Sequence, residues 1–556
     1  MLSIPMLRRG ELSSKLSRWI SLKTSLSNSM RRQRLPKPGV HMVTFRLFLI
    51  TALFPSTVFA AGFFRPGVGA GPLSMGGTGI ASADPTYAAW YNPARLGFAQ
   101  KGFFVSVDGT ALQERTQFRR SSVGLLKPPR DQDNPSFYEN KILQNTEFSD
   151  EFLQAKNCFG QVRAANTPEE DWSPCLPGTR PIPYIALGYG SGKGWSLAFS
   201  AFGPHGMSRD WDKFGPQRYT VVYADVQMQF YQLAAAYRQK DWSVGLGMQN
   251  IRLTVDQTFT VSADVLGTED PGYDAWADVN VADNFIPAAT LGFWRALPFG
   301  LEVGGSLMLP LLAKPCAEGS SERCHVVAEG TVAVDFAEEA ATLVTEVDGD
   351  RGVLTLNFPR LAGLGFTKRF GDRGFINLDF FYEAWAQDVG DVIFRPQELV
   401  IRTSLPGSEE IPFEDVVFPK KWSDSVGVRI GGEYAMKTDL GTTRLRAGFL
   451  YEQAANAPEA MDISALDWDK MGFSVGASHP VTPNIDVDIG YLLIPQTEIS
   501  ITNSSLQSVN IFDAERDPES PNVGQPTGQQ LTTVGNGDYK LSHQRIMASI
   551  RARFGG

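Results

Sequence analysis

The chain has 556 residues, and its 51 lysines and arginines stand against 60 aspartates and glutamates, which gives a formal net charge of −9. This acidic balance argues against nucleic acid as a partner, because phosphate backbones are bound by basic surfaces. Five scattered histidines disfavour both a histidine-rich metal site and a Ser/His hydrolase. The length suits either several small domains or one large barrel.

The first 60 residues are interpreted as a leader. Residues 42–60 contain one arginine, an apolar stretch from Leu47 to Phe54 and small residues before Ala61. This pattern predicts a secretory signal that is cleaved after Ala60. Residues 1–41 are rich in serine and arginine, so they form either a long n-region or an extension upstream of a true start at Met42. We therefore assign residues 1–60 to the leader.

Residues 61–100 cannot form a long helix or strand. A run rich in glycine and alanine covers residues 70–84, and Asn92-Pro93-Ala94 follows it. Glycine lowers the propensity for both structures, and the residue before a proline is kept out of the α region. Aromatic residues such as Phe63 and Phe64 nevertheless make the segment too apolar for a free linker. We expect a compact, irregular segment that is enclosed by the rest of the chain.

After residue 100 apolar and polar residues alternate, as in β-strands. In one segment Ile485, Val487 and Ile489 alternate with Asp486 and Asp488. Charges at every second position suit a soluble sandwich with one solvent-facing sheet, and they equally suit a membrane barrel with a polar lumen. The connections separate these alternatives.

Short turns alternate strictly with long polar connections, which is typical of a transmembrane barrel with tight periplasmic turns and long outer loops. The long connections are expected at residues 127–180, 207–217, 262–285, 313–352, 388–422, 454–469 and 502–538. The sequence therefore predicts an all-β fold, a transmembrane antiparallel β-barrel of fourteen strands over residues 101–556. The strands are expected to begin near residues 102, 181, 195, 218, 242, 286, 301, 353, 375, 423, 443, 470, 485 and 539.

Two details complete the predicted barrel. An extra hairpin is expected around Val326–Val347, in the fourth outer loop. The last strand alternates up to Phe554, which resembles the assembly signal of outer-membrane barrels and implies the barrel-assembly machinery as a partner. Two glycines follow Phe554, which is a mild departure from that signal.

The four cysteines form two local pairs, Cys158 with Cys175 and Cys316 with Cys324. Each pair lies in a predicted outer loop, so both are predicted to be disulfides of an exported protein. Their spacing does not suit a zinc site, and we predict neither a metal nor any other cofactor.

One catalytic motif is present but lacks its context. The residues from Gly472 to Gly476 match the G-x-S-x-G pattern around Ser474. A nucleophile elbow needs a sharp strand-to-helix turn, whereas here the motif lies within an alternating strand. We therefore predict that the protein is not an enzyme.

The N-terminal pattern resembles the FadL/TodX family of outer-membrane transporters of hydrophobic compounds. The resemblance rests on the Gly/Ala run, on Asn92-Pro93-Ala94, on residues 202–206 (FGPHG) and on residues 231–255. With the strand count and the closing strand it covers residues 61–556. It implies a barrel whose lumen is closed by a hatch, here residues 61–100.

The resemblance also implies a function. Members of the family carry long-chain fatty acids or aromatic hydrocarbons across the outer membrane, and ligand passes from outer loops to a pocket at the hatch N-terminus. It then leaves sideways into the lipid, through a gap at a kinked third strand. We accordingly expect passive uptake, by a monomer, of a small hydrophobic ligand that is delivered to outer-membrane lipid.

The residues permit this mechanism physically. Gly203 and Pro204 are candidates for the kink, because proline lacks the N–H that a strand ladder needs. Phe63, Phe64 and Arg65 are candidates for contact with ligand at the hatch N-terminus, although the two phenylalanines could simply wedge the hatch against the wall. Asn92, Pro93 and Ala94 are the further hatch candidates.

Five arginines are predicted to face the lumen, where a guanidinium could hold a carboxylate. They could instead pair with lumen acids such as Glu433, Asp486 and Asp488. The five are Arg429, Arg444, Arg446, Arg551 and Arg553, and the first three are the carboxylate candidates.

Other functions remain open at this stage. Some relatives of the family hold protein cargo at the cell surface, and long acidic outer loops would suit that role. A lipid hydrolase would need Ser474, and a general porin would need an open lumen. The identity of the ligand does not follow from the sequence.

Overall fold

A computed structural model describes residues 67–121, 154–158, 181–511 and 533–555, apart from residues 212, 265–270, 318, 405–409, 414, 440, 462 and 465. The predicted leader and the candidates Phe63, Phe64 and Arg65 lie outside the described residues. None of the helices in the described part is long and apolar enough to cross a membrane.

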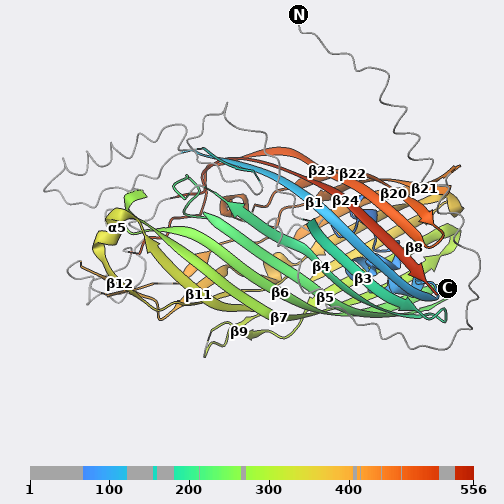
Figure 1. Ribbon diagram of the computed structural model, residues 1–556, viewed down its shortest axis with the longest axis horizontal. Helices are drawn as coiled ribbons and strands as arrows, with labels where there is room; N and C mark the ends of the chain where they lie inside the picture. The colour runs from blue at the N-terminus through green and yellow to red at the C-terminus, as the bar shows by residue number, and fades with distance from the viewer. Residues whose placement is uncertain are drawn as a thin grey trace, which may run out of the picture. The chain divides into compact units, whose positions relative to one another are not determined.

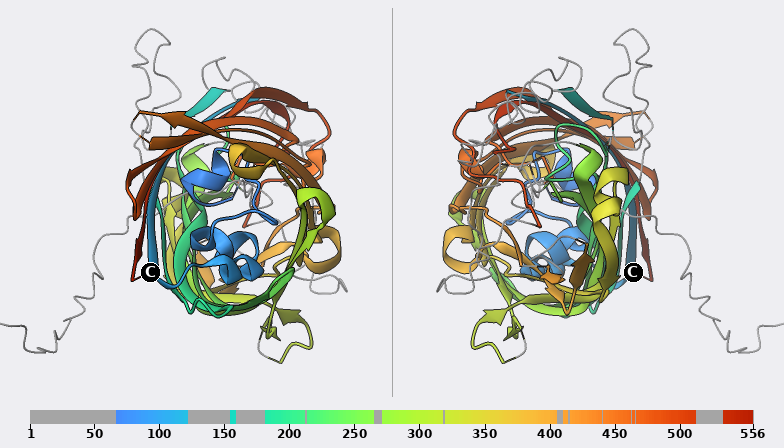
Figure 2. Two further views of the ribbon diagram at one scale, coloured as in Figure 1. Left: turned by 90° about the vertical axis from the view of Figure 1, so that its right-hand side faces the viewer. Right: turned by 90° about the vertical axis from the view of Figure 1, so that its left-hand side faces the viewer.

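In the described part, fourteen strands pair antiparallel with their neighbours and close into a ring. The last strand pairs with the first from Phe103↔Phe554 to Arg120↔Gly537, which removes the sheet edges. Figure 2 shows the ring end-on. The predicted fold is therefore confirmed. The barrel strands are β1 (Gly102–Arg120), β3 (Pro181–Gly190), β4 (Trp195–Asp210), β5 (Tyr223–Gln239), β6 (Trp242–Ser262), β7 (Asp274–Leu297), β8 (Leu301–Pro310), β14 (Leu361–Arg369), β15 (Gly374–Glu383), β20 (Ser425–Thr438), β21 (Gly441–Glu452), β22 (Lys470–Thr482), β23 (Ile485–Ile501) and β24 (Gly537–Phe554).

The alternation in the sequence separates an outer face from a lumen face. On β24, Ile546 and Ile550 are 64% and 56% exposed, whereas Met547 and Arg551 between and beyond them are buried. On β5, Leu233 is 67% exposed and its neighbour Gln232 is buried. Apolar side chains that point outward form the lipid-facing surface that a barrel of this kind needs.

Three predicted strand starts are wrong, and the smallest error is at β5, which begins at Tyr223 rather than near residue 218. The strand expected from residue 286 begins at Asp274, because the first part of β7 extends outward and pairs with β11 (Val326–Phe336) of an outer loop. The strand expected from residue 353 is instead β13 (Arg351–Leu356), which also belongs to that loop. The barrel strand itself, β14, begins at Leu361.

The fourth and fifth outer loops add their own strands at the outer end of the barrel (Figure 1). The expected hairpin at Val326–Val347 is wrong in its pairing, since β11 pairs with β7 and with β13 rather than with β12. The strands β13, β16 and β19 continue the sheet outward. The added elements are β9 (Lys314–Pro315), β10 (Arg323–Cys324), α5 (Glu338–Leu343), β12 (Val344–Asp348), α6 (Trp385–Asp388), β16 (Val392–Gln397), β17 (Val400–Thr403), β18 (Glu410–Pro412) and β19 (Val416–Phe418).

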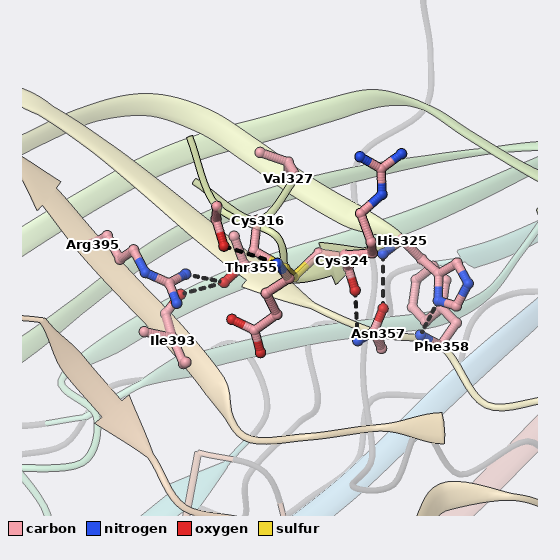
Figure 3. Close-up of a disulfide and its surroundings, with 12 residues drawn as sticks. Cys316, Cys324, His325, Val327, Thr355, Asn357, Phe358, Ile393 and Arg395 are labelled. Atoms are coloured by element: carbon pink, nitrogen blue, oxygen red, sulfur yellow. Dashed lines mark hydrogen bonds between the residues drawn. A yellow bond between two sulfur atoms is a disulfide. The ribbon is translucent and has the colours of Figure 1, made fainter. Parts of the chain in front are cut away.

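A disulfide joins Cys316 to Cys324, as predicted, in the first part of the fourth outer loop (Figure 3). The backbone N–H of His325 donates to Asn357 Oδ1 at 2.9 Å, which ties the disulfide segment to the chain after β13. Cys175 lies outside the described residues. Cys158 ends β2 (Gln154–Cys158), which pairs with the outer part of β1.

Residues 67–99 lie inside the ring, where they appear in blue in Figure 2. They form only short turns of helix, as the glycine and proline content predicts. These are α2 (Ala70–Leu73), η1 (Pro85–Tyr87), α3 (Ala88–Tyr91) and η2 (Pro93–Phe98). We refer to residues 67–99 as the hatch.

Candidate functional site

The hatch is held by hydrogen bonds from its backbone to side chains of the barrel wall. Asp379 Oδ2 on β15 accepts from the N–H groups of Gly79 and Ile80, at 2.7 and 3.0 Å. Ser474 Oγ on β22 accepts from the Gly76 N–H at 2.7 Å. The serine of the G-x-S-x-G motif therefore contacts the hatch, from within a strand.

Asn92 connects two parts of the hatch with the wall. Its Nδ2 donates to the carbonyl oxygens of Ile80 and Phe293, each at 2.8 Å, and its Oδ1 accepts from the Ala94 N–H at 3.0 Å. The side-chain amide of Asn92 thus donates two hydrogen bonds and accepts one. Pro93 follows at the first position of η2, where a missing N–H has no consequence.

The wall approaches the hatch so closely because glycines face it. A β-carbon at Gly448 would lie 2.1 Å from the carbonyl carbon of Met75 and 2.2 Å from the Gly76 nitrogen. One at Gly245 would lie 2.3 Å from the carbonyl carbon of Pro93. No side chain fits into these spaces, so the glycines allow direct backbone contact. The wall glycines with such an approach to the hatch include Gly245, Gly292, Gly304, Gly431, Gly448 and Gly476.

An ion-pair network lies on the lumen face of the wall from β20 to β24, on the inner side of the hatch. Asp488 is fully buried and accepts from Arg446 Nη1 at 2.6 Å and from Arg551 Nε at 2.7 Å. Arg446 Nε also donates to Glu433 at 2.8 Å. Pairing of the lumen arginines with these acids is thus present, as the sequence analysis allowed.

The hatch joins this network through its own acid. Asp84 Oδ2 accepts from Arg551 Nη1 at 2.9 Å and lies 3.6 Å from Arg553 Nη2. Burial alone would raise the pKa of Asp84, but Arg551, Arg553 and the hydrogen bonds from Thr86 together outweigh it and hold the pKa below its usual value. Asp84 is therefore a charged contact between the hatch and β24.

The wall is interrupted beside the hatch. Pairing between β3 and β4 runs from Gly190↔Ser196 to Tyr184↔Phe202 and ends there. The pairing of β4 with β5 shifts register between Phe202 and His205, where three steps on β4 match two on β5. The bulge contains Gly203 and Pro204, the residues predicted to kink this strand.

Aromatic side chains fill the lumen side of this interruption. The Trp90 ring of the hatch meets Phe202 edge-on at 5.7 Å and Phe230 at 6.2 Å, measured between ring centroids. Phe202 and Phe230 stack at 5.5 Å. The Tyr184 hydroxyl donates to the Thr86 carbonyl, which adds a polar contact to the same place.

On the outer side of the hatch, Trp90 also borders a pocket. It is closed below by Ile80, Trp90 and Tyr91 of the hatch. Its walls come from β6, β7, β8, β14, β15 and β20, and carry mostly apolar residues, a few uncharged polar ones, and the charged Glu383 and Arg429. Arg429 borders the pocket, where its Nη2 donates to Glu452 at 3.2 Å and its Nη1 to the Gly77 carbonyl at 3.2 Å.

A second, larger cavity of about 300 Å³ lies on the inner side of the hatch. Arginines and acids of the ion-pair network line it, together with Asp84. Arg444, one of the carboxylate candidates, lies here with 40% of its side chain exposed, 3.4 Å from Glu433. The three candidate arginines are thus divided between the two sides of the hatch.

Comparison with known proteins supports the family predicted from the sequence. Residues 319–525 match the family model described as outer membrane protein transport protein (OMPP1/FadL/TodX). Outer membrane protein P1 of Haemophilus influenzae is 28% identical over 178 residues, which cover 31% of this chain and 34% of that protein.

Solved structures show the same fold. A FadL homologue of Pseudomonas aeruginosa superposes with a TM-score of 0.58 at 14% identity, covering 90% of this chain and 99% of that one. The toluene transporter TodX of Pseudomonas putida gives a TM-score of 0.57 at 12% identity, covering 89% of this chain and 100% of that one. The resemblance to the FadL/TodX family is confirmed.

The family match over residues 319–525 and the closed barrel place this chain in the outer membrane, as its sequence predicts. Sequence reasoning placed Asn92, Pro93 and Ala94 in the hatch and Gly203 and Pro204 at the bulge. It did not single out the aromatic cluster. The available signal was the position of Phe202 directly before Gly203-Pro204. A bulge can re-aim the neighbouring side chain, so Phe202 was a candidate for contact with the hatch.

Proposed function

We propose that this FadL/TodX-type barrel takes up hydrophobic compounds passively across the outer membrane. Ligand would enter from the outer loops, occupy the pocket above Ile80, Trp90 and Tyr91, and leave through the wall between β3 and β4. The observation that carries the proposal is the end of β3–β4 pairing at Phe202, directly against the hatch residue Trp90. A route into lipid follows the partition free energy of an alkyl chain, about 0.8 kcal/mol per CH₂.

Related proteins support this direction without fixing the ligand. The TodX barrel is described as a toluene transporter, and another barrel of this fold, CymD, as a monoaromatic hydrocarbon channel. We extend to this chain only the class, namely a fatty acid or an aromatic hydrocarbon, and we propose a transporter rather than an enzyme. The carboxylate-binding role of Arg429, Arg444 and Arg446 stays a prediction.

The proposal includes the division of the chain made from its sequence. Residues 1–60 would be the leader, residues 61–100 the hatch and residues 101–556 the barrel, with Phe63, Phe64 and Arg65 at the ligand-contacting N-terminus. The protein would act as a monomer, inserted by the barrel-assembly machinery through its last strand.

Deleting Pro204 tests the wall opening. The deletion removes the one extra residue of β4, so that its ladder with β5 becomes regular and the adjacent wall can close. We expect uptake of labelled toluene and oleate, by cells that lack their own channel of this family, to fall at least about tenfold. Deletion of the exposed turn residue Lys193 is the control, with barrel assembly checked by heat-dependent gel mobility.

The outcomes distinguish the competing functions. Normal uptake in the Pro204 deletion would contradict a lateral exit. No uptake by the unaltered protein, together with binding of a secreted protein domain, would favour the cargo-holding alternative. Large and steady single-channel conductance would indicate a porin.

A further inference from the structure

Two buried glutamines face each other across neighbouring strands of the lumen wall. Gln232 on β5 and Gln249 on β6 are directly paired in register, and they are 0% and 6% exposed. Both lie on the lumen face, since the alternate residues Tyr231, Leu233 and Met248 are exposed on the outside. Buried glutamines inside a membrane barrel need partners for their amide groups.

Most of those partners are missing within the described part of the chain. There, neither the nitrogen nor the oxygen of the Gln232 amide has a hydrogen-bond partner, and the same holds for Gln249 Oε1. Only Gln249 Nε2 is used, as it donates to Thr290 Oγ1 at 2.7 Å. A buried amide atom without a partner destabilises the fold, so a pair that keeps three such atoms calls for an explanation.

The backbone makes room for the Gln232 amide. A β-carbon on Gly247 would lie 1.9 Å from Gln232 Nε2, so the amide occupies the space above a residue that has no side chain. Gly247 is two residues from Gln249 on the same face of β6, which brings the two amides to one place on the wall.

The pair lies between the pocket and the wall opening. Gln249, Thr290 and Ser306 line the pocket above the hatch, on three adjacent strands. Gln232 pairs in register with Ser200 on β4, two residues before Phe202, where the β3–β4 ladder ends. An uncharged polar row thus leads across β4 to β8, from the pocket to the opening.

We propose that Gln232 and Gln249 select neutral hydrophobic molecules that carry a single hydroxyl group, such as alkylphenols and medium-chain alcohols. This inference rests on the proposed uptake function and names its substrate class. A hydroxyl group both donates and accepts, so it can pair with an amide oxygen or an amide nitrogen. The rest of the molecule would lie against Trp90 and the apolar side of the pocket.

Two other ligand classes fit these residues less well. A carboxylate would need a cation, and the charged side chains that line the pocket are Arg429 and Glu383. Arg429 is already held by Glu452 and by the Gly77 carbonyl, so a buried carboxylate would lack compensation. A bare hydrocarbon would leave the glutamine amides unpaired, and a site built for a hydroxyl discriminates against the analogue without it.

Three probes of one shape test this choice. They are p-cresol, p-xylene and p-toluate, which carry a hydroxyl, a methyl or a carboxylate group at the same ring position. Binding is measured by titration calorimetry on the full chain in lipid nanodiscs, with empty nanodiscs as the reference for partitioning. We expect p-cresol to bind about tenfold more tightly than either of the others.

The double variant Gln232→Leu/Gln249→Leu should abolish this preference by weakening p-cresol about tenfold, with p-xylene unchanged or tighter. Gln229→Leu is the matched control, because Gln229 lies on β5 but on the opposite, outward face. Its preference should equal that of the unaltered protein. Circular dichroism and heat-dependent gel mobility establish that each variant is a folded barrel.

Each outcome has a separate meaning. An unchanged preference for p-cresol in a folded double variant would overturn the inference, and so would tightest binding of p-toluate by the unaltered protein. Binding of p-xylene equal to that of p-cresol would overturn the inference and leave hydrophobic uptake standing. Failure of all three probes to bind, with no uptake of toluene or oleate, would overturn the proposed function as well.

Discussion

Two walls of the lumen differ in the charge of the side chains that face it. Along β6 the lumen-facing residues from Ser243 to Val255 are serine, glycine, glutamine, isoleucine, leucine and valine, with no charge among them. On the other side of the ring, β21, β23 and β24 carry the connected charges of Arg446, Asp488 and Arg551. The hatch touches both walls, through glycine spaces on each side and through Asp84 on the charged side only.

The difference indicates a division of tasks. Ion pairs buried in a lumen hold their partners in one geometry, which suits the wall that anchors the hatch. A wall without charges spares a hydrophobic ligand the larger cost of desolvating charged side chains, which suits a route for such a ligand. The interruption of β4 adjoins the uncharged wall at Phe230 of β5, away from the ion pairs.

The largest effect is expected from Asp488→Ala. This change leaves Arg446 and Arg551 facing each other without the acid that joins them, and loss of one partner of a buried ion pair costs about 3–5 kcal/mol. Urea unfolding in lipid vesicles, followed by tryptophan fluorescence, should show this loss in the free energy of unfolding.

Glu498→Ala supplies the comparison for that experiment. Glu498 lies on the same strand and pairs with Lys540 at 3.4 Å, with more than half of its side chain exposed. An exposed pair contributes at most about 1 kcal/mol. Equal losses in the two variants would show that the charged wall is solvated rather than buried.

The barrel was predictable because alternation and loop asymmetry are repeated along the chain. β24 is an example, since outward and lumen-facing positions alternate without a break from Ile546 to Arg551, and Met547 is the one apolar residue on the lumen face there. The outer half of β7 was missed because Asp274, Asp278 and Asp283 give it the appearance of a polar loop. These acids have partners in the fold: Arg218 for Asp274, Thr258 for Asp278 and Lys314 for Asp283.

The site was predictable only where one short segment defines it. Asn92-Pro93-Ala94 is such a segment, and it lies in the hatch. The contact of Trp90 with Phe202 and Phe230 joins three distant segments, so no local pattern encodes it. The three amide atoms of Gln232 and Gln249 that lack a partner in the described part of the chain depend on what covers them, which a sequence does not state.

A smaller effect is expected from Gly448→Ala, which tests the close contact between the hatch backbone and the charged wall. The new β-carbon would overlap Met75 and Gly76, and such overpacking costs about 1–3 kcal/mol. We expect the hatch rather than the barrel to yield, so ion conductance in planar bilayers should rise while the unfolding transition changes little. Gly109→Ala is the control, since a β-carbon there has nothing within 4 Å.

The smallest effect is expected from Asp84→Asn, which removes the single charge that the hatch places on β24. Since the pKa of Asp84 is lowered in the docked hatch, its contribution is complete above about pH 4–5, near the ordinary aspartate pKa. It is lost as the pH falls through the lowered value. For this partly exposed pair we expect about 1 kcal/mol, or roughly fivefold more frequent opening of the hatch at pH 7.

Hydrogen exchange of the Thr86 amide, which donates to Asp84 Oδ1 at 3.0 Å, measures this opening directly. Between pH 8 and pH 5 the difference between the two proteins should be constant, and below about pH 4 it should shrink because the unaltered protein loses the same contact. If the two proteins differed only below pH 4, the charge of Asp84 would not hold the hatch at neutral pH.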